Sequence, residues 1–150
     1  MEREEVRAFV NQYGRLRDVQ FAAYELYARK HGLTAKELFV LDIIWFEPDG
    51  CLQSDICDRL SATKQTVSAI IKKFLKQGYV SLTESEADRR NKIVRFTEAG
   101  IAYTQKIIPP AAHAEIDAMS GLSGEDIAEL VRLTARFSHC MKEKFEQIRV

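Results

Sequence analysis

Apolar residues recur at three- and four-residue steps across residues 3–30 and 123–148, which predicts an amphipathic helix in each. Each helix would be about 40 Å long at about 1.5 Å per residue. The segment between them is too small to cover both apolar stripes. We therefore expect the stripes to pack against a second copy in a two-fold dimer, with an antiparallel pair inside a monomer as the alternative. The stripe residues are Val6, Phe9, Tyr13, Leu16, Tyr24 and Tyr27 in the first helix and Ile127, Leu130, Val131, Thr134, Phe137, Met141, Phe145 and Ile148 in the second.

A strong helix start follows the first long helix. Thr34 and Glu37 are three residues apart, the pattern of a capping box. Leu33 and Leu38 occupy the hydrophobic-staple positions around Thr34. The turn residues Pro48-Asp49-Gly50 predict the end of this helix. The residues expected to be buried on it are Leu38, Leu41, Ile44 and Trp45.

Two further helices separated by a short turn are predicted next. Ser54 is the expected cap of a helix over residues 54–60. Thr63 is the expected N-cap of the following helix, and Gly78 is its expected C-terminal stop. The inward stripe of this second helix is predicted to be Val67, Ile70, Ile71, Phe74 and Leu75.

Alternating residues then predict a two-stranded ribbon over 79–83 and 92–96, with Cys51-Leu52 as a short additional strand. Another helix is expected to open at residues 97–100. Pro109-Pro110 must bend or break it, because proline removes a backbone donor and its ring clashes with the preceding turn. Helix should resume near residue 111 and end around 121.

These elements predict a mainly α fold, an α+β winged helix-turn-helix lobe over residues 33–99. Residues 1–32 and 100–150 would form a discontinuous helical dimerisation region. The chain is 46% hydrophobic, enough to bury a core. No apolar run approaches the roughly 18 residues of a membrane span, and the first residues hold no signal-peptide core. We therefore expect a cytoplasmic protein with no membrane partner.

The distribution of charge favours a nucleic-acid partner, although the net charge is zero. Residues 61–95 hold eight Lys and Arg residues against three acidic ones, while the rest of the chain is correspondingly acidic. A basic stripe on a helix-turn-helix motif can bind DNA phosphates and place a helix in the major groove. An ordinary solvated helix face, or a winged-helix protein-interaction module without DNA binding, is the alternative.

The candidate DNA contacts fall on the second helix of the motif, on the helix before it and on the polar hairpin tip. Gln65 can pair bidentately with adenine, and Lys64 can donate to guanine acceptors. Three lysines further along this helix are expected to contact DNA phosphates: Lys72, Lys73 and Lys76. For Lys73, plain exposure to solvent is the alternative. The full candidate set is Ser54, Thr63, Lys64, Gln65, Thr66, Ser68, Lys72, Lys76, Asp88, Arg89, Arg90 and Lys92.

Other chemistry finds little support. The chain has three cysteines, Cys51, Cys57 and Cys140, and this odd number does not suggest a secreted disulfide framework. The acidic neighbours of Cys57 give no support for a reactive thiolate, so packing is the expected role of Cys57. His31, His113 and His139 have no metal-ligand spacing. We expect no cofactor and no metal. The chain holds no GxSxG, P-loop, HExxH or dinucleotide motif, so we expect no enzyme activity.

The chain resembles the MarR family of bacterial winged helix-turn-helix transcription regulators over nearly its full length. The matching segments are GLTAKELFVLDII before the motif, QSDICDRLSATKQTVSAIIKKFLKQGYV for the motif, EADRRNKIVRFTEAG for the wing and LSGEDIAEL at the start of the last helix. One departure is Ser61, where the family often has Gly or Asn. If that turn needs positive φ, Ser61 carries a cost of about 1 kcal/mol.

The resemblance implies a triangular homodimer whose first and last helices interleave and whose two lobes straddle a pseudo-palindromic operator. The matching wing arginine, Arg90, would enter the minor groove, and Asp88 would brace it through a salt bridge. Arg89 and Lys92 are the alternatives to Arg90. A narrow minor groove concentrates negative potential and favours such a guanidinium.

Many family members release DNA when a small aromatic compound binds between the dimer helices and the lobe. The resemblance therefore favours a repressor released by an aromatic effector. A thiol-based redox regulator is the alternative on the same scaffold, although peroxide-sensing members carry their cysteine near the start of the first helix, where this chain has none. The candidate effector residues, for which plain packing is the competing interpretation, are Phe21, Tyr24, Tyr27, Trp45 and His113.

Overall fold

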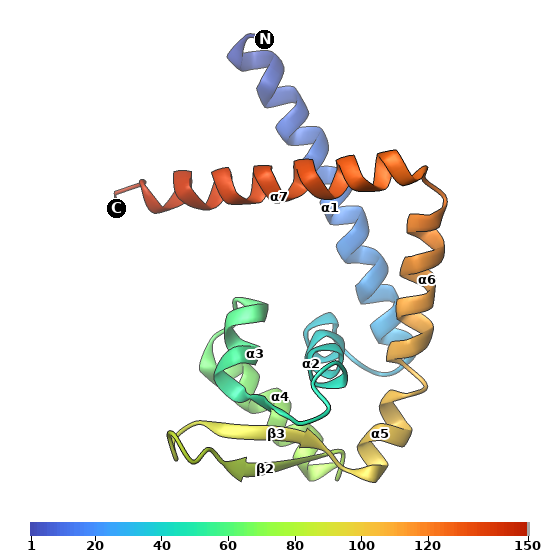
Figure 1. Ribbon diagram of the computed structural model, residues 1–150, viewed down its shortest axis with the longest axis vertical. Helices are drawn as coiled ribbons and strands as arrows, with labels where there is room; N and C mark the ends of the chain where they lie inside the picture. The colour runs from blue at the N-terminus through green and yellow to red at the C-terminus, as the bar shows by residue number, and fades with distance from the viewer. Residues whose placement is uncertain (150) are drawn as a thin grey trace. The chain divides into compact units, whose positions relative to one another are not determined.

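The computed structural model describes residues 1–149, so Val150, the last residue of the expected dimerisation region, lies outside the described residues. The chain divides into two compact units, Met1–Ile108 and a second that begins at Pro109. Figure 1 shows the elements in chain order. The first unit holds α1 (Arg3–Lys30), α2 (Ala35–Trp45), β1 (Cys51–Leu52), α3 (Gln53–Leu60), α4 (Lys64–Lys76), β2 (Val80–Glu84), β3 (Lys92–Phe96) and α5 (Glu98–Thr104). The helices after it are α6 (Ile108–Ser120) and α7 (Gly124–Glu146).

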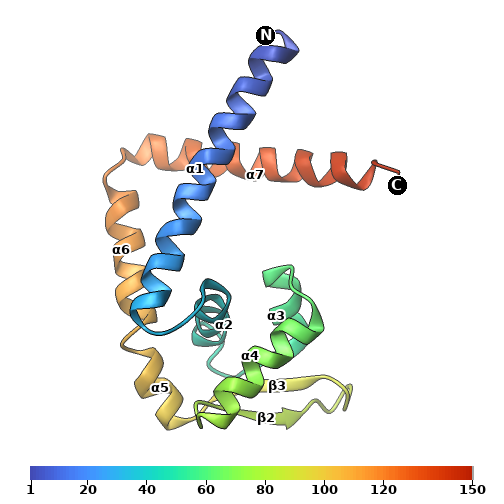
Figure 2. The same cartoon turned by 180° about the vertical axis from the view of Figure 1, so that it is seen from behind.

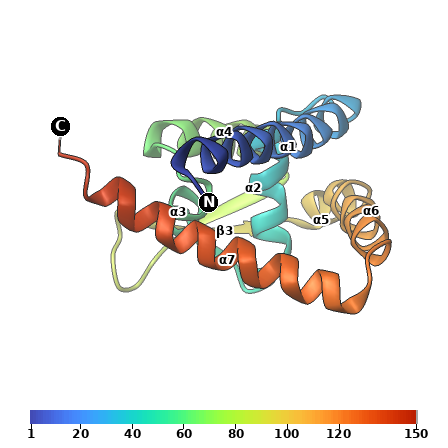
Figure 3. The same cartoon turned by 90° about the horizontal axis from the view of Figure 1, so that it is seen from above.

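The strands form one antiparallel sheet in the order β1-β3-β2. Val94 in the central strand pairs with Cys51 on one side and Leu82 on the other. The predicted ribbon and short strand are therefore confirmed, with β2 one residue later than expected. In Figure 1, α2 and α3 lie on one side of β3, and Figure 3 shows the same elements from above. Figure 2 shows the tip of the β2–β3 hairpin projecting past α3.

The start of α2 confirms the predicted capping box. Thr34 Oγ1 accepts from the Glu37 backbone N–H at 3.2 Å, and Glu37 Oε2 accepts from the Thr34 N–H at 3.0 Å. Leu33 and Leu38, at the staple positions, are both buried. Both side chains belong to the buried core of the first unit. Its largest fully buried side chains include Leu41, Ile44, Ile56, Val67, Ile71, Phe74 and Val94.

Two predictions about local packing are wrong. Ser54 does not cap α3, because the helix begins one residue earlier, its N-cap is Leu52, and Ser54 Oγ instead accepts a hydrogen bond from Asn91. Leu75 is 42% exposed rather than buried, because the buried face of α4 ends at Phe74 and Leu75 lies beside it on the rim.

The proline pair breaks the helix as predicted. The helix α5 ends at Thr104, and α6 begins at Ile108, earlier than residue 111. Pro109 and Pro110 therefore sit in the first turn of α6. Backbone N–H groups have no helical partner at that position, so proline costs no hydrogen bond there.

The helix α1 has the predicted bounds, whereas α7 ends at Glu146 rather than at residue 148, and both helices expose much of their apolar surface. On α1, Phe9 is 60% and Leu16 57% exposed, while Tyr24 and Tyr27 are half-buried where the end of α1 contacts α2. On α7, Val131 is 58% and Phe145 63% exposed. These apolar residues are thus not covered by the unit to which their own helix belongs.

Candidate nucleic-acid interface

The first turn of α4 is organised by the predicted N-cap. Thr63 Oγ1 accepts from the Thr66 backbone N–H at 3.2 Å, and the two side-chain hydroxyls are 2.9 Å apart. This pair satisfies a backbone donor that the helix itself leaves unpaired. Lys64 and Gln65 are exposed at the same helix end. The cap therefore fixes the turn from which these two side chains project.

The rest of α4 separates into a buried face and a basic face. Val67, Ile70, Ile71 and Phe74 pack into the core, which leaves the other side of the helix for polar residues. Lys72 and Lys76 are exposed, and Ser68 is half-buried. Four of the expected DNA-facing residues, Lys64, Gln65, Lys72 and Lys76, are thus in contact with solvent.

Lys73 stands apart from these lysines. Its Nζ is 2.8 Å from Glu37 Oε1 at the start of α2, so it forms an ion pair that joins α4 to α2. The Lys73 side chain is only 41% exposed. Neither expectation for Lys73, a phosphate contact or plain exposure, anticipated this ion pair.

The wing is folded by Asp88, although not in the expected way. Asp88 Oδ1 accepts from the Arg90 backbone N–H at 3.0 Å, and the Asp88 carbonyl accepts from the Asn91 N–H at 3.0 Å. Among residues 1–149, no ion pair joins Asp88 to the Arg90 guanidinium. The expected salt bridge is therefore wrong. The Asp88 carboxylate closes a tight turn, as Asp commonly does with the backbone two residues on, and the Arg90 side chain stays exposed.

The two alternatives to Arg90 differ in their surroundings. Arg89 is exposed at the hairpin tip. Lys92 pairs across the ribbon with Glu84, with Nζ 3.0 Å from Oε1. The Lys92 ammonium therefore stabilises the pairing of β2 with β3 and also adds to the positive electrostatic potential of the wing.

A groove of about 370 Å³ brings the wing, α3 and the start of α4 together. Lys64 and Arg90 both line it, from α4 and from the wing. Ser54 on α3 and Asn91 on the wing form two hydrogen bonds there, at 2.8 and 3.3 Å. Sequence reasoning missed Asn91, because nothing in the local sequence shows that its partner lies 37 residues away. The remaining lining residues are Gln53, Cys57, Asp58 and Asp88.

Comparison with known proteins identifies this arrangement. A model of the MarR family matches residues 31–91, from the end of α1 through the wing. The HTH-type transcriptional regulator MhqR of Bacillus subtilis is 31% identical over 101 residues, 67% of this chain and 68% of that protein. This chain belongs to the MarR family. It is a DNA-binding transcriptional regulator and not an enzyme.

Solved structures of other transcriptional regulators have the same fold. NMB1585, a MarR family regulator from Neisseria meningitidis, superposes with a TM-score of 0.80 at 22% identity, covering 92% of this chain and 96% of that one. The PcaV transcriptional regulator from Streptomyces coelicolor, solved in complex with its natural ligand, superposes with a TM-score of 0.66 at 19% identity, covering 84% and 91%. The α+β winged-helix prediction is therefore confirmed.

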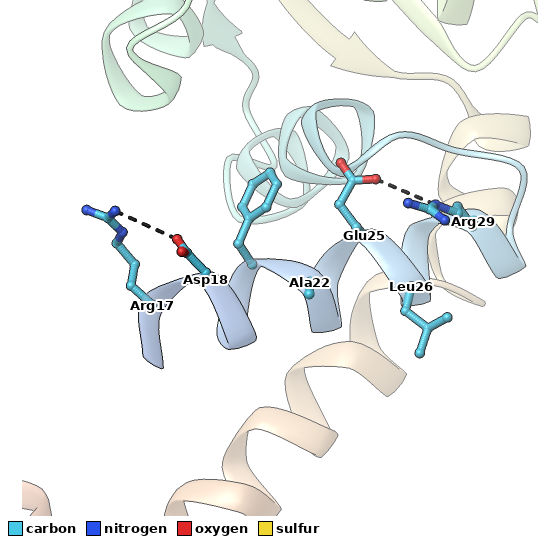
Figure 4. Close-up of a pocket in the computed structure, with 7 residues that line it drawn as sticks. Arg17, Asp18, Ala22, Glu25, Leu26 and Arg29 are labelled. Carbon is cyan, nitrogen blue, oxygen red and sulfur yellow. Dashed lines mark ion pairs between the residues drawn. The ribbon is translucent and has the colours of Figure 1, made fainter. Parts of the chain in front are cut away.

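In this MarR-family chain the candidate effector residues have different environments. Figure 4 shows a pocket along α1, lined by Phe21 together with Arg17, Asp18, Ala22, Glu25, Leu26 and Arg29. Tyr24, Tyr27 and Trp45 are not among its lining residues. The Tyr24 ring meets Phe39 edge-on with centroids 5.1 Å apart.

The other candidates have packing roles or lie elsewhere. The Tyr27 hydroxyl donates to the Ile107 carbonyl at 2.7 Å, and burial raises the pKa of Tyr27. Trp45 is half-buried, with its ring centroid 6.3 Å from that of Phe96. His113 is exposed on α6, outside the first unit. Tyr27 and Trp45 thus support the core whether or not they also meet an effector.

The three cysteines of this regulator are also unlike one another. Cys51 is buried in β1, and burial, together with the negative charges of Glu47 and Asp55, raises its pKa to about 11. Cys57 is half-buried and packs against the core, which confirms its expected packing role. Cys140 is exposed on α7. A raised thiol pKa argues against reactivity at Cys51, because the thiolate is the reactive form.

Residues 1–149 hold neither a cluster of metal-binding side chains nor a helix suited to crossing a membrane. No group of three or more His, Cys, Asp or Glu side chains gathers there in a way that could hold a metal ion. His31 stacks edge-on against Tyr27, and His139 Nε2 is 3.5 Å from Glu143 Oε1. No helix in this range has the length and apolar character that crossing a membrane requires.

Proposed function

We propose that this MarR-family regulator is a homodimeric repressor that binds a pseudo-palindromic operator and leaves it when a small aromatic effector binds. The observation that carries the proposal is the shared groove of Lys64 and Arg90, where the basic face of α4 meets the wing. A helix in the major groove and a basic arm in the adjacent minor groove need to meet at such a place.

Within this proposal the contacts divide by role. Gln65 and Lys64 read base edges at the exposed start of α4, with Thr63, Thr66 and Ser68 beside them. Lys72 and Lys76 contact phosphates, which position the helix without reading sequence. Arg90 enters the minor groove, supported by the positive charge of Arg89 and Lys92 and by the turn that Asp88 closes.

Dimerisation is supported by the exposed stripes of α1 and α7. Phe9, Leu16, Val131 and Phe145 are each more than half exposed in a single copy. Monomeric soluble proteins rarely expose apolar surface on this scale without a partner to cover it. A two-fold dimer would also place two α4 helices about 34 Å apart, in successive major grooves of one face of DNA.

Release by an effector is supported by the aromatic surface of α1. Phe21 and Tyr24 both lie within ring contact of Phe39 on α2, so a ligand at this surface would touch both the long helix and the lobe. A relative of the same fold, PcaV, is solved with its natural ligand. An effector shifts the DNA-binding equilibrium only by its difference in affinity for the two conformations.

The test is selection of bound duplexes from a random pool by the wild type and by Arg90→Ala. We expect the wild type to enrich a two-fold sequence, and Arg90→Ala to bind it about tenfold or more weakly with an unchanged melting temperature. Lys36→Ala, an exposed lysine on α2, is the matched control and should bind like wild type. Repeating the selection with small aromatic acids tests release. No enriched sequence, or equal binding by Arg90→Ala, would contradict the proposal.

A thiol-based regulator is the second candidate, favoured by one observation. Cys57 lines the groove between Lys64 and Arg90, where an adduct on its sulfur would occupy space at the proposed DNA contact. Replacing Cys51, Cys57 and Cys140 with Ser tests it. Oxidant-induced release that persists in the triple variant excludes this mechanism, and release that disappears supports it.

A further inference from the structure

Two hydrogen bonds join the wing to α3. Asn91 Nδ2 donates to Ser54 Oγ at 2.8 Å, and the Ser54 backbone N–H donates to Asn91 Oδ1 at 3.3 Å. The backbone N–H can only donate, so it fixes which end of the Asn91 amide faces it. We call this pair, Asn91 and Ser54, the wing clamp.

The backbone of Asn91 is held as firmly as its side chain. Its N–H donates to the Asp88 carbonyl at 3.0 Å, and its carbonyl accepts from the Ser85 N–H at 3.2 Å. The neighbouring Arg90 N–H donates to Asp88 Oδ1 at 3.0 Å. The segment from Ser85 to Asn91 is therefore one hydrogen-bonded turn, and the wing clamp connects that turn to α3.

The helix α4 is also held in place by α3. The helix α3 contacts α4 directly, and the turn between them is only three residues long, Ser61 to Thr63. Lys64, the first residue of α4, lines one groove with Ser54 and Arg90. The spacing between the start of α4 and the wing is thus set through α3 and the wing clamp.

We propose that Asn91 is a positioning residue for DNA binding, which holds the wing through Ser54 so that Arg90 reaches the minor groove while α4 occupies the adjacent major groove. This inference rests on the proposed function. A hairpin tip that is already ordered loses less conformational freedom on binding than a mobile one, so pre-organisation raises affinity. Asn91 acts through Arg90 in this mechanism, and its own amide oxygen already accepts from Ser54.

The first test needs no DNA. In the full chain, ¹⁵N relaxation at the Arg90 amide should show lower order in Asn91→Ala, which removes both clamp bonds. Ser54→Ala, which removes one bond, should give an intermediate value, and Ser54→Thr, which keeps the hydroxyl, should resemble wild type. An Arg90 amide equally ordered in Asn91→Ala and wild type would overturn the proposal.

The second test is a double-mutant cycle on the selected duplex. Asn91→Ala should weaken binding about tenfold, and Arg90→Ala should then cost a much smaller factor than it does in the wild type. Gln65→Ala, on α4, should cost the same factor in both backgrounds. Thermal unfolding of each variant checks that the lobe remains folded.

The outcomes separate the two proposals. If the wild type binds and the losses from Arg90→Ala and Asn91→Ala simply multiply, the positioning role of Asn91 is overturned while the proposed function stands. If the wild type selects no duplex, the proposed function fails and the positioning role fails with it, whereas the relaxation result still shows whether the clamp orders the wing.

Discussion

The ammonium nitrogen of Lys73 lies 2.8 Å from Glu37 Oε1, and the other oxygen of the same carboxylate accepts from the Thr34 backbone N–H at 3.0 Å. One side chain therefore closes the N-terminus of α2 and holds α4 against it. The Glu37 side chain is only 12% exposed, so this contact is shielded more than an ordinary surface pair. Lys73 therefore stabilises the packing of α4 against α2, whereas its neighbour Lys72 is exposed and has its charge available to DNA.

Substitution should distinguish these two adjacent lysines. Lys72→Ala should reduce the slope of log K against log salt concentration by about 0.9 for each phosphate that the variant no longer neutralises. Lys73→Ala should leave that slope unchanged and lower the free energy of unfolding by about 1 kcal/mol. Titrations of the selected duplex between about 50 and 200 mM salt measure the slope. A slope that Lys73→Ala reduces as much as Lys72→Ala does would show that the Lys73–Glu37 pair does not remove Lys73 from DNA binding.

Ser61 has a left-handed backbone, with φ 47° and ψ 40°, at the end of α3. A side chain in this region costs free energy that glycine avoids. Ser61→Gly should therefore raise the free energy of unfolding by about 0.5–1 kcal/mol, since the greater entropy of unfolded glycine offsets part of the gain.

Urea unfolding measures this change, and Ser61→Val is the opposing control. A β-branched residue tolerates positive φ poorly, so Ser61→Val should unfold at lower urea than the wild type. If glycine destabilises the chain, the hydroxyl of Ser61 contributes more than its backbone conformation costs.

Local sequence signals predicted most of the secondary structure. The bounds of α1 follow from its apolar periodicity, and Thr34 and Thr63 each cap a helix through their side chains as predicted. Ser54 also lies at the start of a predicted helix, but the prediction that it caps α3 is wrong. A hydroxyl near a helix start can serve a backbone N–H or a distant side chain, and only the folded chain shows that Asn91 competes for it.

The site could be predicted in part for the same reason. The basic face of α4 follows from periodicity, because Val67, Ile70, Ile71 and Phe74 must face inward. The pairing of Lys73 with Glu37 and of Asn91 with Ser54 could not be predicted, since each joins residues 36 or 37 positions apart through tertiary packing. Which of the exposed residues touch DNA remains a prediction.

The thiols should differ in reactivity. At about pH 8, Cys140 should react readily with an alkylating agent in the native protein, whereas Cys51 should stay unmodified because burial and nearby acidic charge keep it protonated. Mass spectrometry after timed alkylation reads out each site. Rapid labelling of Cys51 in the folded protein would contradict its raised pKa.

The same pKa shift predicts a change of stability at alkaline pH. Below the ordinary thiol value of 9.0 both states hold the Cys51 proton, so folding is unaffected. Between there and about 11 the unfolded chain loses the proton while the folded chain keeps the neutral thiol in its buried site, so stability falls as pH rises. Cys51→Ala should lose less stability over this window in urea unfolding than the wild type.

The exposed stripe of α1 should be needed for association. Phe9 is 60% exposed in one copy, so Phe9→Glu should place a charge in the proposed dimer interface and weaken association by about tenfold or more. Sedimentation equilibrium measures the effect. Asn11→Glu, also exposed but on the opposite side of the helix by its spacing, should sediment like wild type. A Phe9→Glu protein that associates as tightly as wild type would exclude this stripe from the interface.

Hydroxyl-radical footprinting of the wild-type protein on its selected duplex tests the proposed complex most directly. The two-fold dimer predicts symmetric protection about the operator centre, with major-groove contacts about 10 base pairs apart and minor-groove protection outside them. Arg90→Ala should lose the outer protection and keep the inner one. A single unsymmetrical footprint, or outer protection that survives in Arg90→Ala, would contradict the paired α4 helices and wings.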